Sequence, residues 1–180
     1  VELYGQYRDS EAHVIFNGKV VGEMHYNPGN NSFSVSLTAF DPYLECCAIM
    51  FNPSFSSPAH PRIFDLIIPA LKKVDGRNQM YKIDFSEPSQ LIQYASRMAK
   101  QSIRLKTKIP ESKENTFDTL FGGRFTYPSP LNFILYHESN PKNAVCTNFA
   151  IDETTLSLSV GYPLSPIQAF FGAVAASIPF

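Results

Sequence analysis

The sequence predicts an α+β protein of two units, each an antiparallel β-sheet followed by a packed α-helix. Three observations lead to this prediction. Runs of β-prone residues separated by turn residues fill the first forty positions, an amphipathic helical stretch follows at 89–104, and further β-prone runs precede a second helical stretch near the C-terminus. The 180 residues are 44% hydrophobic and 17% charged, which is the composition of a folded globular chain.

The first forty residues predict a β-meander. An Asn17-Gly18 pair separates two β-prone runs, and both residues tolerate the positive φ angles of a type I′ turn. The last run alternates apolar and polar residues, as a half-buried strand does. The strands expected here are 3–8, 13–16, 19–24 and 33–37.

The next segment, 41–61, is rich in proline and serine and predicts an irregular connection with one short strand around 48–51. A helix is expected at 62–73, because its apolar residues recur at helical spacing, and Gly76 would terminate it. A strand at 80–85 should follow.

The helix expected at 89–104 has two distinct faces. Its apolar stripe consists of Leu91, Ile92, Ala95, Met98, Ala99 and Ile103. The opposite face carries Arg97, Lys100 and Arg104, and Lys106 and Lys108 continue the positive charge in an emerging strand. These cations lack the acidic i,i+4 partners typical of an exposed helix face. The stripe therefore predicts a docking surface for an acidic partner, with a plain solvated helix face as the other interpretation.

The distribution of charge supports a directed contact. The formal net charge is −1, yet the segment from Arg62 to Lys113 holds eleven basic and five acidic residues, and the remainder holds four basic and eleven acidic ones. An overall pI of about 6.5 argues against a dedicated nucleic-acid binder. The longest apolar runs are too short to span a bilayer, and no signal peptide opens the sequence.

The second half repeats the plan of sheet and then helix. Ser165-Pro166 is a good N-cap and first-turn pair, and it should open a helix whose apolar face includes Phe170 and Phe171. Turns are expected at Asn140-Pro141 and Ile151-Asp152. The strands expected before the helix are 116–120, 124–127, 132–137, 144–150 and 155–160.

Catalytic chemistry is not expected. His137, Cys146 and Asp152 could form a nucleophile, base and orienter, but nothing in their spacing supports this, and a buried inert thiol is the ordinary explanation of Cys146. His13 and His25 flank the first hairpin without other evident ligands, so no metal is expected, nor any cofactor. Three cysteines without metal-type spacing indicate reduced thiols in a cytosolic or nuclear compartment.

The region around the first amphipathic helix resembles the end of the first polo box in the centriole-duplication branch of the polo-like kinases. The residues that carry this resemblance are Tyr81, Asp84, Pro88, Tyr94-Ala95-Ser96-Arg97, Arg104 and Lys106-Thr107-Lys108-Ile109. Ile134-Leu135 and Glu138-Ser139-Asn140-Pro141 are similar to the opening of the second polo box. The segment from Pro110 to Pro130 is longer than the family pattern, which indicates a divergent member.

The resemblance implies two polo boxes, 1–109 and 110–180. It implies a non-catalytic, homodimerising module that docks a serine/threonine kinase to centrioles in the cytoplasm, with neither nucleic acid nor membrane as a partner. The implied partner is an acidic segment of a centrosomal scaffold protein, bound through Arg97, Lys100, Arg104, Lys106 and Lys108. A β-rich viral matrix or coat domain is the alternative, and an enzyme using Cys146 and His137 is the least favoured one.

Overall fold

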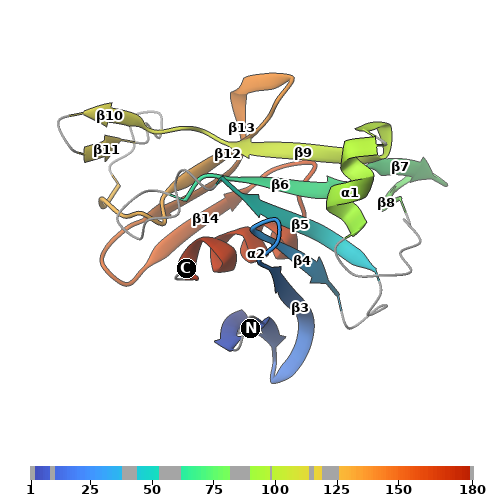
Figure 1. Ribbon diagram of the computed structural model, residues 1–180, viewed down its shortest axis with the longest axis horizontal. Helices are drawn as coiled ribbons and strands as arrows, with labels where there is room; N and C mark the ends of the chain where they lie inside the picture. Colours follow the sequence, from blue (N-terminus) through green and yellow to red (C-terminus); the bar gives the residue numbers. More distant parts are fainter. Residues whose placement is uncertain are drawn as a thin grey trace. The chain divides into compact units, whose positions relative to one another are not determined.

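A computed structural model shows an α+β protein of antiparallel β-sheet and two short α-helices (Figure 1). It describes residues 3–8, 11–37, 44–52, 62–81, 90–97, 99–113, 116–118 and 126–178. The chain forms two compact units, Val1–Met50 with Leu66–Arg104, and Phe51–Asp65 with Leu105–Phe180. The division at residues 109 and 110 stays a prediction.

The first unit opens with the predicted meander. The strands β1 to β5 are hydrogen-bonded in chain order, and Asn17 and Gly18 turn the β2–β3 hairpin with φ angles of 49° and 75°. The expected hairpin and the strand after it are therefore confirmed. The bounds are β1 Leu3–Arg8, β2 Glu11–Phe16, β3 Lys19–Asn27, β4 Ser32–Ser36 and β5 Glu45–Phe51.

A short helix, α1 (Gln90–Arg97), covers part of this unit. Leu91 and Ile92 of α1 pack with Ala48 and Ile67 in one buried cluster. The backbone N–H of Leu91 donates to the buried carboxylate of Glu45 over 2.8 Å, so β5 holds the start of the helix. Burial of the apolar stripe, rather than helix propensity, stabilises so short a helix.

The helix predicted at 62–73 is wrong. This stretch forms strand β6 (Phe64–Pro69) and strand β7 (Leu71–Val74), and β7 pairs with β8 (Arg77–Met80). β6 is almost wholly buried, including consecutive residues that point to opposite faces. A run buried on both sides suits an inner strand, whereas an amphipathic helix buries one stripe.

The helix predicted at 89–104 is too long. α1 ends at Arg97, a 3₁₀ turn η2 spans Ala99–Gln101, and strand β9 spans Ser102–Thr107. In β9, Leu105 and Thr107 are buried and alternate with less buried residues, which is the period of a strand. Thr107 also bonds through its hydroxyl to the backbone N–H and carbonyl of Phe64.

In the second unit the strands β12, β13 and β14 are neighbours in chain order. The strand predicted at 144–150 is longer than expected, because β13 already begins at Asn140. A strand was also predicted at 124–127, and its described part forms a single β-bridge from Tyr127 to Ala150. The remaining bounds are β10 Glu111–Lys113, β11 Thr116–Asp118, β12 Phe133–His137, β13 Asn140–Ala150 and β14 Leu156–Val160.

Helix α2 (Pro166–Ser177) confirms the C-terminal prediction. Ser165 caps it and forms a capping box with Gln168, in which each residue bonds the other's backbone N–H. Phe171 and Gly172 are buried, and Gly172 faces the ring of Phe64.

Candidate functional site

The hairpin β7–β8 is the centre of the candidate site. Asp75 and Gly76 form its turn with φ angles of 51° and 76°. In its register Lys72 pairs with Gln79 and Val74 with Arg77, which places Lys72 and Arg77 on one face and Lys73 on the other. All three basic residues are exposed.

The base of this hairpin is joined to the end of the α1–η2 segment. The N–H of Ala70 donates to the carbonyl of Gln101 over 2.7 Å, and the N–H of Tyr81 donates to the carbonyl of Ala70 over 2.8 Å. Tyr81 and Tyr94 pack against the same buried cluster that holds α1, and the Tyr94 hydroxyl bonds to the side chain of Gln101. The hairpin and the end of α1–η2 are therefore neighbours (Figure 1).

Five exposed cations lie on these two neighbouring segments, with Lys73 on the other face of the hairpin from Lys72 and Arg77. We call them together the basic surface: Lys72, Lys73, Arg77, Arg97 and Lys100. In Leu71–Tyr81, Gln90–Arg97 and Ala99–Gln101 the acidic residue is Asp75 alone. Within the described part of the chain, no ion pair neutralises any of the five. The Lys72 ammonium lies 5.5 Å from the ring centroid of Tyr81, a cation–π contact that orients it.

The five cations predicted as a binding site lie in different surroundings in the structure. Arg97 and Lys100 are exposed in the first unit, next to the hairpin. Arg104 lies half-buried in β9, where it already interacts with another group. Lys106 pairs with Glu138 at 2.6 Å, and Lys108 is exposed after β9 in the second unit. The predicted common helix face is wrong, since the helix ends at Arg97.

Sequence reasoning missed the three cations of the hairpin. Lys72 and Lys73 were placed at the end of a helix, and Gly76 was interpreted as its terminator. The signal that could have found them is Asp75-Gly76, because Asp-Gly between β-prone runs is a strong hairpin signal.

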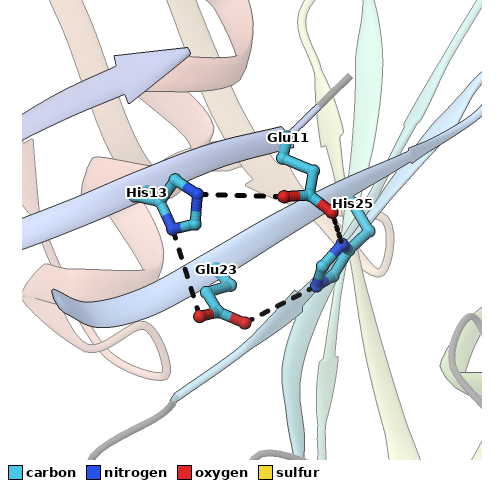
Figure 2. Close-up of polar contacts among 4 residues, drawn as sticks. All are labelled: Glu11, His13, Glu23 and His25. Carbon is cyan, nitrogen blue, oxygen red and sulfur yellow. Dashed lines mark ion pairs between the residues drawn. The ribbon is translucent and has the colours of Figure 1, made fainter. Parts of the chain in front are cut away.

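A second polar cluster lies on β2 and β3 of the first unit. Figure 2 shows Glu11, His13, Glu23 and His25 arranged as a closed ring, which we call the His–Glu quartet. His13 lies 3.9 Å from Glu11 and 4.0 Å from Glu23, and His25 lies 3.4 Å from Glu11 and 3.7 Å from Glu23. The expectation that the two histidines lack neighbouring ligand-type residues is wrong.

The groups considered for catalysis are placed for other roles. Burial raises the pKa of Cys146 to about 12, the opposite of what a thiolate nucleophile needs. The carboxylate of Asp152 accepts hydrogen bonds from Thr154 and Thr155, which hold its pKa below the usual value.

The described residues show neither a metal-binding cluster nor a membrane-spanning helix. They hold no group of three or more His, Cys, Asp or Glu side chains placed to bind a metal ion. No helix among them is long and apolar enough to cross a bilayer.

The fold and site define an α+β protein with an exposed cationic surface, and comparison with known proteins gives its family. The sequence model of the Tub family matches residues 11–177, and the chain belongs to that family. Protein king tubby of Drosophila pseudoobscura pseudoobscura is 28% identical over 159 residues, which cover 82% of this chain and 34% of the relative. The same protein of Drosophila sechellia is 27% identical, covering 82% and 35%. The chain thus spans about a third of the length of these relatives.

Membership of the Tub family corrects the functional expectations. The resemblance to polo boxes is wrong, and so is the expected docking of a centriolar kinase. The expected partners, namely an acidic scaffold segment and a second copy of the chain, with no membrane and no nucleic acid, are wrong as well. The viral alternative is equally unsupported. The Tub family is non-enzymatic, in agreement with the expectation that this chain is not an enzyme.

Proposed function

We propose that this Tub-family chain is a binding module whose basic surface holds the phosphorylated headgroups of inositol lipids at a membrane. The observation that carries the proposal is the Ala70–Gln101 hydrogen bond, which keeps the basic hairpin beside the basic end of α1–η2. Clusters of four to eight Lys and Arg residues are typical of sites for such lipids.

The chemistry of the five side chains suits a ligand with several phosphates. Arg77 and Arg97 offer planar guanidinium groups that can bind phosphate oxygens in a bidentate manner, and the lysines supply mobile ammonium groups. Because the cations come from two segments, a headgroup with two or more phosphates can contact both at once. Each basic residue near an anionic membrane contributes roughly 1 kcal/mol, so the five together provide reversible association.

The charge of the remaining chain favours a local contact over general attraction to polyanions. The whole sequence carries a formal net charge of −1, so the five cations act against an acidic remainder. Long nucleic acids are bound mainly by extended basic surfaces. A compact cationic surface on an otherwise acidic protein is better matched to a headgroup.

Vesicle cosedimentation tests the proposal. The full chain should bind phosphatidylcholine vesicles that contain a few per cent of a phosphatidylinositol bisphosphate, and the variant K72E/R77E/R97E/K100E should bind at least about tenfold more weakly. The control K19E/K142E reverses two exposed lysines elsewhere in the chain, half as many as the fourfold variant, and should bind as the wild type does.

Two results would overturn the proposal. One is wild-type affinity of the fourfold variant for these vesicles. The other is capture of duplex DNA by the wild type with higher affinity than the vesicles and its loss in the fourfold variant, which would assign the basic surface to nucleic acid.

A further inference from the structure

Lys72 and Lys73 are adjacent in strand β7 but lie on opposite faces of the β7–β8 hairpin. In the register Lys72 pairs with Gln79, and Lys73 pairs with Asn78. Successive residues of a strand alternate between its two faces, so Arg77, two positions from Gln79, shares the face of Lys72. The hairpin therefore has a Lys72–Arg77 face and a Lys73 face.

The Lys72–Arg77 face lies toward helix α1. The Lys72 ammonium lies over the ring of Tyr81, 5.5 Å from its centroid. Tyr81 packs, together with Tyr94 of α1, against the buried cluster that holds this helix. An aromatic ring thus holds Lys72 on the side of the helix that ends at Arg97.

Backbone hydrogen bonds fix the position of this ring. The N–H of Tyr81 donates to the carbonyl of Ala70 over 2.8 Å, and the N–H of Ala70 donates to the carbonyl of Gln101 over 2.7 Å. Tyr81 is therefore connected both to the base of the hairpin and to the end of the α1–η2 segment. Lys72, Arg97 and Lys100 are brought together through this connection.

The contact with Tyr81 changes what Lys72 can contribute to binding. A lysine side chain is flexible, and it loses conformational entropy when a ligand immobilises it. A ring beneath the ammonium restricts that motion in advance, so less entropy is lost on binding. In the part of the chain that the structure describes, Lys73 has no such aromatic contact.

We propose that the phosphorylated headgroup is bound on the Lys72–Arg77 face, against the end of α1–η2, and that Tyr81 is a positioning residue that directs Lys72 toward it. The inference rests on the function proposed above and narrows the basic surface to four cations, with Lys73 outside the site. Gln79, opposite Lys72, adds an amide that can donate to or accept from the hydroxyls of an inositol ring. Such a site recognises a discrete phosphorylated ring, so it binds the soluble headgroup as well as the lipid.

Calorimetric titration of the full chain with inositol trisphosphate, the soluble headgroup of a phosphatidylinositol bisphosphate, tests the proposal without a membrane. Lys72→Ala should weaken binding about 5- to 10-fold, as expected for a charged hydrogen-bond donor. Lys73→Ala removes the same charge from the adjacent position and should stay within about twofold of the wild type.

Two substitutions of Tyr81 test its positioning role. Tyr81→Leu should weaken binding about 2- to 5-fold through loss of the cation–π contact, whereas Tyr81→Phe keeps a ring and should retain binding. Because Tyr81 acts through Lys72, K72A/Y81L should bind no more weakly than Lys72→Ala alone. A purely structural role of Tyr81 would weaken binding equally in both backgrounds.

The possible results separate this inference from the function on which it rests. Equal weakening by Lys72→Ala and Lys73→Ala would overturn it, since charge alone would then decide. Equal effects of Tyr81→Leu with Lys72 and with Ala at position 72 would overturn the positioning role. Vesicle binding by the wild type without binding of inositol trisphosphate would overturn this inference alone, whereas binding of neither would overturn the proposed function as well.

Discussion

Lys106 Nζ lies 2.6 Å from Glu138 Oε1, and this ion pair uses a cation that the sequence assigned to partner binding. The two side chains are 34% and 63% exposed, so the pair is worth only about 0.2–1 kcal/mol. A cation already paired within the chain adds less to the attraction of an anionic ligand than a free one does. Basic residues of the segment 97–108 thus differ in role: Lys106 is paired within the chain, whereas Arg97 and Lys100 belong to the basic surface.

This difference predicts unequal effects of two matched substitutions. Lys106→Ala should lower the free energy of unfolding by at most about 1 kcal/mol and leave vesicle binding within twofold of the wild type. Lys100→Ala should leave unfolding unchanged and weaken vesicle binding several-fold. Urea denaturation and cosedimentation measure both quantities, and the reverse order of the two binding effects would contradict the assignment.

Glu45 should be essential for the start of α1. Its carboxylate accepts the buried Leu91 N–H, so Glu45→Ala leaves that donor unpaired at a cost of about 1–3 kcal/mol. Glu45→Gln keeps an acceptor oxygen and should cost less. Urea denaturation with hydrogen exchange of the α1 amides measures the effect. Equal stability of the alanine and glutamine variants would show that the hydrogen bond has no such role.

Two glycine substitutions should act with opposite signs. Gly76 has a φ of +76° in the β7–β8 turn, so Gly76→Ala should destabilise the protein by about 1 kcal/mol. Gly172 lies inside α2, and an added Cβ would meet the Phe64 ring at 3.9 Å, an ordinary contact. Gly172→Ala should therefore stabilise by up to about 1 kcal/mol through helix propensity. Thermal denaturation of both variants checks the signs.

Cys146 should make stability fall in alkaline solution. Its pKa is raised to about 12 by burial, whereas an unfolded thiol ionises near 8.5. Between these values the unfolded state binds fewer protons, so the free energy of unfolding decreases as pH rises, by up to about 1.4 kcal/mol per pH unit. Urea denaturation from pH 8 to 10.5 should show a steeper fall for the wild type than for Cys146→Ala. Parallel curves would contradict this linkage.

Local signals in the sequence were sufficient for several elements. Asn17-Gly18 predicted the β2–β3 hairpin, and Ser165-Pro166 predicted the start of α2. Both signals act within a few residues, through allowed φ angles and through capping of free N–H groups. They predict an element whatever packs against it.

Periodicity failed where burial came from both sides. The apolar residues of 62–73 fit a helical stripe, yet β6 lies buried among other strands. The pattern at 89–104 fits a helix up to Arg97 and a strand from Ser102, and only packing decides where one ends. Because a helix was predicted where β6 and β7 lie, the basic residues of β7–β8 could not be assigned to a common surface.

The His–Glu quartet shows why register needs the tertiary structure. Ile15 pairs with Val20, but Val14 pairs with Gly22, so a bulge shifts the register by one residue. Without the bulge, His13 would face Gly22, and Glu23 would lie on the opposite face. The two carboxylates reach the two imidazoles only because of this extra residue.

The sequence by itself was sufficient to predict the α+β class, the first hairpin, the C-terminal helix and the excess of cations in the central segment. Each of these depends on interactions among near neighbours or on composition. The tertiary structure decided three other features: the proximity of the basic hairpin to α1–η2, the pairing of Lys106, and the ring of Glu11, His13, Glu23 and His25. They depend on which strand lies beside which and in what register, and that is set by burial of apolar residues that are distant in the sequence.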